Sequence, residues 1–377
     1  MKKLLLHIGM PKAGSTAIQH FLKDNELKLA DLRIHYLKAG LGQRELVKQS
    51  KLAQPFAYTL SPVQTRREPP KVKRDATAEN MAQAVTEIAT TDFDTYVISV
   101  EELFPTFATN LVNADTKVSQ MYLEWFQQLS EICQITVLVY LRRQDLFVES
   151  LYAQFQKGGG SPLRLLEFHE FLANLNDIGV LDYEQVVANL GQLPGVQHII
   201  VRPFERSQLK DGDAINDFAQ ILGITDSSEF TAQGESNTVN FPRQFSIMLQ
   251  QAAIVGTDQQ LRKTFENMVA SGKKLPTWAL TASGKYFMSP AERTKLVTDN
   301  QAGNDQLAKE YLNQEQLFHS LPSIDEDPNW TPPIVNPSVT EPPGVKQLDA
   351  TYSPSLQIPS KLKDSLSSVI RQLRNHR

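Results

Sequence analysis

The sequence has a single cysteine, Cys133, among 377 residues. An intrachain disulfide is therefore excluded, and the place of this residue at the head of an apolar stretch favours a small buried hydrophobe over a nucleophile. Such sparing use of cysteine is compatible with a reducing compartment. We expect the protein to be cytoplasmic.

Long apolar runs and an excess of positive charge are also missing. No apolar segment is long enough to cross a bilayer, and the run that begins at Leu4 breaks at His7 without a small-residue cleavage pattern, which argues against a signal peptide. The net charge of −4 does not indicate a broadly basic surface for nucleic acid or a membrane, so any anion site must be local. The sequence has no cluster of His and Asp residues suited to a metal, and we expect no metal cofactor.

The most informative segment lies at the N-terminus. An apolar run over residues 4–8 enters a Gly- and Pro-containing turn over 9–16, after which apolar residues repeat at helical spacing over 18–22. This order predicts a strand, a tight loop and a helix. A loop in that position aims backbone N–H groups at the space above the helix N-terminus, where the helix dipole favours an anion. We therefore expect a phosphate site in this loop.

The loop differs from a nucleoside-triphosphate P-loop in the position of its lysine. Gly9 and Gly14 have the P-loop spacing, and Thr16 stands where the magnesium-binding hydroxyl would be. Ser15 replaces the lysine of that motif, and the lysine lies upstream at Lys12. A kinase or nucleotide triphosphatase, the alternative function, needs the lysine after the second glycine. A simple strand-to-helix turn with a surface lysine is the structural alternative.

A second anion site is predicted after the strongest strand pattern, which covers residues 135–141. Arg142 and Arg143 follow this strand directly, and Ser150 lies eight positions after Arg142 on a predicted helix. Arginines at a strand end are suited to binding phosphate. A surface ion pair with Asp145 or Glu149 is the alternative for both arginines.

A strand predicted over residues 96–100 ends at a carboxylate, Glu101. Open α/β sheets bind ligands at the carboxyl ends of their strands, so Glu101 would lie near the loop at 9–16 if the two strands are neighbours. It could then accept the proton of an attacking hydroxyl. A helix-capping or salt-bridged carboxylate is the alternative. Three other candidates for the base stay open: Glu102, His7 and His20. Of these, we expect His7 to be a strand residue in the core and His20 to lie on a helix surface.

Together, the shifted lysine in residues 11–16 and the Arg142–Ser150 spacing resemble the two phosphate motifs of the sulfotransferase superfamily, in the bacterial branch that is similar to carbohydrate sulfotransferases. The resemblance implies an α/β, P-loop-like three-layer fold with a central, mainly parallel sheet flanked by helices. It also implies transfer of a sulfuryl group from the co-substrate 3′-phosphoadenosine 5′-phosphosulfate to an acceptor hydroxyl or amine, with a glycan as the first candidate. The Arg-Lys-Gly-x-x-Gly stretch of the small-molecule cytosolic branch is absent, so the contacts it provides there must come from elsewhere.

The resemblance assigns roles to individual residues. Lys12 would neutralise charge that develops on the departing phosphate, and Glu101 is the base we favour. The residues expected to hold the 5′ end of the donor are Lys12, Ala13, Gly14, Ser15 and Thr16, and those expected at the 3′-phosphate are Arg142 and Ser150, with Arg143 as an assistant.

Composition changes near residue 320. We expect residues 1–320 to form the sulfotransferase-like domain, and 321–377 to form a Pro-rich C-terminal extension that ends in a short amphipathic helix. This tail suggests a further alternative, a non-catalytic interaction protein. Other local predictions are an exposed basic loop over 61–75, helices over 76–89 and 163–175, and a capping box over 289–292.

Overall fold

The computed structural model describes residues 1–41, 49–53, 60, 69–108, 116–157, 162–225, 230–231, 243, 246–247, 249–250, 285–328 and 330–331. The described strands form one sheet in the order β2-β3-β1-β4-β5, and every neighbouring pair is parallel. The strands are β1 (Lys2–Gly9), β2 (Ile34–Tyr36), β3 (Thr95–Ser99), β4 (Cys133–Leu141) and β5 (Val196–Pro203). The predicted α/β fold with a parallel sheet is thus confirmed.

Strands β1 and β4, two of the three inner strands, have the burial pattern of a parallel sheet that is covered on both faces. Their side chains are buried with little alternation, for example Leu4, Leu6 and Ile8 in β1, each 0% exposed. Strands of this kind lie under helices on both sides, because crossover connections place a helix on each face. The chain therefore forms a layered domain around one apolar core.

Helices cover both faces of the sheet. The helical segments are α1 (Ser15–Asp24), α2 (Glu26–Asp31), η1 (Ser50–Leu52), α4 (Lys71–Thr90), α5 (Leu103–Ala108), α6 (Lys117–Ile132), α7 (Gln144–Lys157), η4 (Pro162–Leu165), α8 (Phe168–Asp177), α9 (Tyr183–Gly191), η5 (Lys210–Gly212), α10 (Ala214–Ile221), α14 (Pro290–Asp299), α15 (Gln301–Leu307), η6 (Ala308–Leu312) and η7 (Ile324–Glu326).

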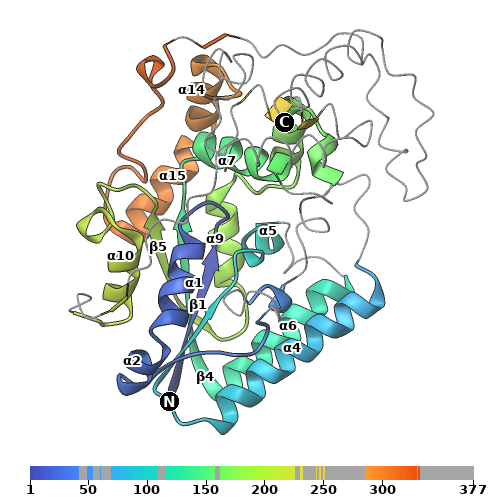
Figure 1. Ribbon diagram of the computed structural model, residues 1–377, viewed down its shortest axis with the longest axis vertical. Helices are drawn as coiled ribbons and strands as arrows, with labels where there is room; N and C mark the ends of the chain where they lie inside the picture. Colours follow the sequence, from blue (N-terminus) through green and yellow to red (C-terminus); the bar gives the residue numbers. More distant parts are fainter. Residues whose placement is uncertain are drawn as a thin grey trace, which may run out of the picture.

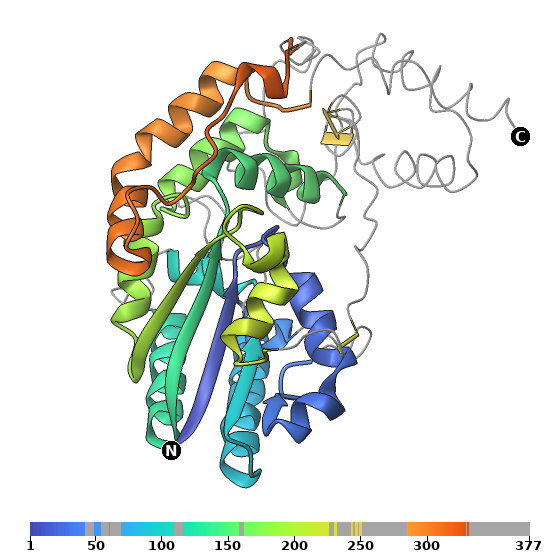
Figure 2. The same cartoon turned by 90° about the vertical axis from the view of Figure 1, so that its left-hand side faces the viewer.

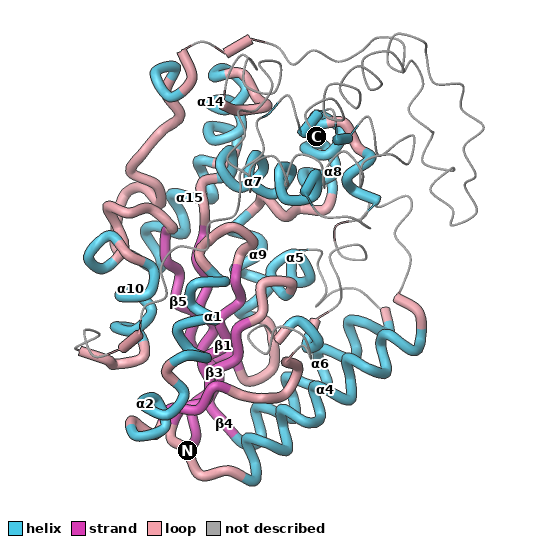
Figure 3. Tube along the Cα trace, in the orientation of Figure 1, coloured by secondary structure: helices cyan, strands magenta, loops and turns pink. Residues whose placement is uncertain are grey.

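Helices α1 and α10 lie together on one face (Figures 1 and 2), where the rings of Phe21 and Phe218 meet edge-on at 6.5 Å. Helices α5, α6 and α9 pack on the other face, as right-handed crossovers require. All five strands run in the same direction, so that their carboxyl ends lie at the end of the sheet opposite the N-terminus (Figure 3).

Two local predictions need correction. Helix α4 begins at Lys71 rather than at 76, because Pro70 occupies its N-cap position and Lys71 pairs with Asp75 at 2.6 Å one turn later. The predicted basic loop is therefore partly helical, and its residues 61–68 lie outside the described residues. The predicted helix over 163–175 is two segments, η4 and α8. The chain breaks at Glu167, whose N–H donates to Glu170 Oε2 at 3.0 Å and starts α8.

The predicted capping box is confirmed at the start of α14. Ser289 Oγ accepts from the N–H of Glu292 at 3.2 Å, and Glu292 Oε2 accepts from the N–H of Ser289 at 2.7 Å. Most of the predicted C-terminal extension, residues 332–377, lies outside the described residues, so the division near residue 320 stays a prediction. Among the described residues, no helix has the length and apolar character needed to cross a membrane.

Candidate functional site

Three strand ends meet at one edge of the sheet. Strand β1 lies between β3 and β4, with His7 paired to Ser99 and Gly9 paired to Tyr140. The loop that follows β1 therefore starts beside the residues that follow β3 and β4. The chain leaves β1 toward β2 and later crosses to β4 and β5 on the other side, which makes this edge a topological switch point. Open α/β sheets bind ligands in the crevice outside such a point.

The loop between β1 and α1 has a backbone suited to an anion. Lys12 and Gly14 have φ values of 70° and 78°, and the N–H of Ala13 donates to the carbonyl of Met10 at 3.1 Å. A left-handed lysine is uncommon because its Cβ crowds the backbone, and such strain concentrates at functional sites. Gly14 is the N-cap of α1, and within the described chain no side chain caps this helix. The first-turn N–H groups of α1 therefore face the space above the loop.

Two glycines allow the loop to pack closely against its neighbours. A Cβ at Gly14 would lie 2.9 Å from Cε2 of Phe204, in the segment that follows β5. A Cβ at Gly9 would lie 2.9 Å from Cβ of Ser15 and 3.2 Å from Cβ of Glu101. A larger residue at either position would have to displace these groups. The loop is thus seated against residues that follow β3 and β5, and Phe204 is a contact that the sequence patterns do not reveal.

Arg142 joins the two predicted phosphate motifs. Its Nη1 donates to the carbonyl of Lys12 at 2.8 Å and to Oγ of Ser150 at 3.3 Å. The backbone of Arg142 is held as well, because its N–H donates to Sδ of Met10 at 3.2 Å and its carbonyl accepts from the Tyr183 hydroxyl at 2.6 Å. The structure therefore brings the backbone carbonyl of Lys12 and the side chains of Arg142 and Ser150 together.

The charge of Arg142 is poorly compensated. Burial lowers the pKa of its guanidinium group, and the charge of Asp145 offsets this only in part. Within the described residues no carboxylate forms a direct ion pair with Arg142. Its hydrogen bonds go to a carbonyl and a hydroxyl, which are neutral. A half-buried cation in this state gains free energy when an anion binds beside it. This is the electrostatic property expected of a phosphate site.

Arg143, in contrast, does not contribute to this site. Its Nε and Nη2 donate to the two carboxylate oxygens of Asp145 at 2.7 and 3.0 Å, and the side chain is 1% exposed. Asp145 is also bonded to Arg293, which is fully buried. The expected assistance to the 3′-phosphate is therefore wrong, because the guanidinium group is turned into the core and forms a buried ion pair there.

Glu101 lies where it was predicted, beside the loop. Its Oε2 accepts a hydrogen bond from Oγ of Ser15 at 2.7 Å, and the residue is 9% exposed. The carboxylate is thus held next to the first turn of α1, where the helix dipole stabilises negative charge.

The histidine candidates lie elsewhere. His7 is fully buried, its Nδ1 is 2.8 Å from Oγ of Ser99, and its ring packs against Tyr140 and Phe218. Burial lowers the pKa of His7 to about 3, so the ring is neutral at physiological pH. It is the core residue that the sequence predicts, without access to an acceptor. His20 is half-buried on α1.

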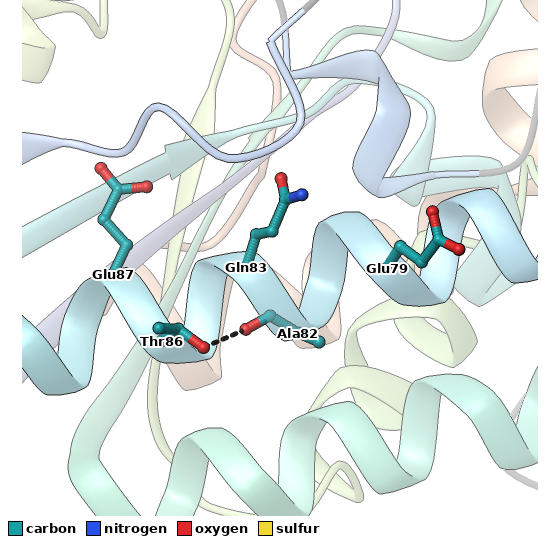
Figure 4. Close-up of a pocket in the computed structure, with 5 residues that line it drawn as sticks. All are labelled: Glu79, Ala82, Gln83, Thr86 and Glu87. Atoms are coloured by element: carbon teal, nitrogen blue, oxygen red, sulfur yellow. Dashed lines mark hydrogen bonds between the residues drawn. The ribbon is translucent and has the colours of Figure 1, made fainter.

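A surface depression on α4 is a different feature. It is lined by Glu79, Ala82, Gln83, Thr86 and Glu87, and Figure 4 shows Glu79, Gln83 and Glu87 on one side of the helix. The carboxylate of Glu87 already accepts from Nε2 of His35 and from the backbone N–H groups of residues 38 and 39. These lining residues include no cation, so the depression is unsuited to an anionic nucleotide. In the part of the chain that the structure describes, no group of three His, Cys, Asp or Glu residues is placed to hold a metal.

Comparison with known proteins leaves the family open. No protein-family model matches the chain. An uncharacterized protein of Archaeoglobus fulgidus is 27% identical to it over 193 residues, which are 51% of this chain and 50% of that protein. The chain thus spans about half the length of the curated relative that it matches.

Proposed function

We propose that this chain is a sulfotransferase that uses 3′-phosphoadenosine 5′-phosphosulfate as donor. The observation that carries the proposal is the contact of Arg142 with both Lys12 and Ser150, at 2.8 and 3.3 Å, across two neighbouring strand ends. A nucleotide with phosphates at both ends needs two cationic sites within one crevice. The shifted lysine distinguishes this loop from one that binds a triphosphate with magnesium.

In the proposed reaction the acceptor oxygen or nitrogen attacks the sulfur of the donor. A bond forms between this atom and sulfur, and the bond between sulfur and the 5′-phosphate oxygen breaks. The electron pair of the broken bond stays on the departing adenosine 3′,5′-bisphosphate, and the proton of the acceptor passes to a carboxylate. Groups that stabilise the departing phosphate accelerate this step, since charge develops there in the transition state.

The loop residues supply that stabilisation. The ammonium group of Lys12 would neutralise the phosphate, while the backbone N–H groups of residues 14–16 and the hydroxyl of Thr16 would hold its oxygens. The N–H of Ala13 and the hydroxyl of Ser15 already donate to Met10 and Glu101. Arg142 and Ser150 would bind the 3′-phosphate. In this arrangement the buried guanidinium of Arg142, which has no direct ion-pair partner among the described residues, would pair with a phosphate when the donor binds.

Glu101 is the proposed base. The hydrogen bond from Ser15 uses Oε2, which leaves Oε1 for the proton of the acceptor. Ser15 and Glu101 pack so closely on Gly9 that a Cβ at this position would meet both, which keeps the carboxylate next to the phosphate loop. An acceptor that reaches Glu101 would therefore also be near the sulfur. The acceptor is proposed to be a hydroxyl or an amine, with a glycan as the first class to test.

Calorimetric titration with adenosine 3′,5′-bisphosphate tests the proposal without an acceptor. Adenosine 5′-phosphate and magnesium-ATP are the comparison ligands. We expect the bisphosphate to bind most tightly and without added metal. Arg206→Ala, which changes an exposed arginine after β5, is a control variant and should leave the affinity for the bisphosphate unchanged. A preference for magnesium-ATP would instead support a kinase or triphosphatase. Failure of all three nucleotides to bind would support a non-catalytic role.

A further inference from the structure

Among the residues that the structure describes, no strand pairs with the carboxyl end of β3 on the side of β2. Pairing between β2 and β3 ends at Tyr36 and Val97, and the next N–H along the chain, that of Leu37, still donates to the carbonyl of Val97 at 3.1 Å. Ser99 lies two residues beyond Val97, and its N–H and C=O face the same side as those of Val97. Ser99 is fully buried, so both groups need partners that β2 is too short to supply.

Two glutamine side chains supply these partners. Oε1 of Gln49 accepts from the N–H of Ser99 at 2.7 Å, and Nε2 of Gln19 donates to the carbonyl of Ser99 at 3.2 Å. Nε2 of Gln49 also donates to the carbonyls of Leu37 and Ala39, at 2.8 and 3.2 Å. The carboxamide of Gln49 thus accepts on one side and donates on the other, as a peptide group of a further strand would.

On its other side, Ser99 is hydrogen-bonded to β1. Oγ of Ser99 is 2.8 Å from Nδ1 of His7, and the N–H of Val100 donates to the carbonyl of His7 at 3.0 Å. Gln19 and Gln49 are 1% and 0% exposed, so their bonds to Ser99 form without competing water. The backbone is therefore held from both sides immediately before Glu101.

We propose that Gln49, assisted by Gln19, is a positioning residue for the proposed base Glu101. Its carboxamide extends the hydrogen bonding of the sheet past the end of β2, and this keeps β3 in place up to the point where Glu101 meets Ser15. The inference rests on the proposed function, because it concerns the proton-accepting group of that reaction. A displacement of about 1 Å at a reacting group lowers turnover by roughly 10- to 100-fold.

The test uses Gln49→Met, which keeps the size of the side chain and removes its hydrogen bonds. The rate measured is release of sulfate from ³⁵S-labelled donor with water as acceptor, at saturating donor, since this needs no identified acceptor. Affinity for adenosine 3′,5′-bisphosphate is measured in parallel. Gln156→Met is the matched control. Gln156 lies in the last turn of α7, is also buried, and donates a hydrogen bond to the backbone carbonyl of Arg164.

We expect Gln49→Met to lower the rate of sulfate release by roughly 10-fold or more, with bisphosphate affinity within about twofold of wild type and Gln156→Met unchanged in both. The decisive comparison adds Gln49→Met to Glu101→Gln. A positioning residue has no further effect on the rate once the base is gone, whereas a merely structural residue lowers the rate by the same factor in both backgrounds.

A conservative variant, Gln49→Glu, keeps the inference testable if Gln49→Met does not fold. Burial keeps a carboxylic acid at this position protonated near pH 6, where it can accept from the N–H of Ser99 and donate to the carbonyl of Leu37. We therefore expect Gln49→Glu to release sulfate at close to the wild-type rate at pH 6. A rate far below wild type at this pH, in a folded variant, would count against the positioning role.

Two results with Gln49→Met would overturn the inference alone: an unchanged rate in the folded variant, or an equal fall in the Glu101→Gln background. Failure of the wild-type chain to bind the bisphosphate, or to release sulfate above the uncatalysed rate, would overturn the proposed function itself.

Discussion

The buried histidine of β1 makes stability depend on pH in a way that can be calculated. His7 has an ordinary pKa of 6.5, which burial lowers to about 3 in the folded protein. The unfolded chain therefore binds a proton below pH 6.5 that the folded protein excludes. The stabilisation that depends on a neutral His7 is complete above pH 6.5 and is lost progressively as the pH falls from 6.5 toward 3.

The magnitude follows from the two pKa values. At pH 5.0 the unfolded histidine is almost fully protonated and the folded one is almost fully neutral, a difference worth about 2 kcal/mol relative to pH 7.5. This is a large fraction of the free energy of unfolding of an ordinary domain, which is about 5–15 kcal/mol. Replacement of His7 by an uncharged residue should remove this contribution.

Urea unfolding at pH 7.5 and pH 5.0, followed by tryptophan fluorescence, measures the effect. His7→Asn is the test variant, because its carboxamide can still bond Oγ of Ser99. We expect the wild type to lose about 2 kcal/mol more than His7→Asn between the two pH values. His20→Asn, at a half-buried position on α1, is the control and should lose as much as the wild type. Equal losses in wild type and His7→Asn would show that His7 does not cause this pH dependence.

Three other changes test separate parts of the structure. Lys12→Ala should lower turnover by more than it lowers affinity for the bisphosphate, measured by single-turnover kinetics and calorimetry, whereas equal losses in both would contradict a role in the transition state. Gly14→Ala should destabilise more than Gly223→Ala in thermal unfolding. Both glycines have positive φ, a backbone cost of about 1–2 kcal/mol, but a Cβ at Gly223 meets nothing within 4 Å whereas one at Gly14 meets Phe204 at 2.9 Å. Lys2→Met should lower stability by about 1 kcal/mol, because Nζ of Lys2 donates to the carbonyl of Thr91 at 2.7 Å beyond the C-terminus of α4, and an unchanged melting temperature would contradict this role.

The parts of the site that the sequence could predict are those with a local signature. The loop at 9–16 is recognisable because glycines, a lysine and hydroxyls follow an apolar strand at fixed spacing. The pair Arg142 and Ser150 is recognisable because the helix after β4 brings the serine back toward the strand end. The placement of Glu101 required only that β1 and β3 be neighbours, as they are.

The parts that could not be predicted depend on partners far along the chain. Arg142 and Arg143 are adjacent arginines that the sequence pattern does not distinguish. In the structure Arg143 pairs with Asp145, which Arg293, 148 positions further along the chain, holds in the core. Gln49 stands in a segment without periodicity, 50 positions before the N–H group that it accepts from. Phe204 reaches Gly14 only because β5 ends beside the loop. Composition and residue spacing do not predict such long-range contacts, because they depend on tertiary packing.

The proposed role of Arg142 is to bind the second phosphate of a nucleotide, and one ratio of affinities measures it. The measurement is the affinity for adenosine 3′,5′-bisphosphate divided by that for adenosine 5′-phosphate, in the wild type and in Arg142→Ala. Hydrogen bonds to a charged group are worth about 1.5–3 kcal/mol, so we expect a wild-type ratio of roughly 10 to 150. The ratio should fall to near 1 in Arg142→Ala, with affinity for the 5′-phosphate retained. An equal ratio in both proteins would contradict the account.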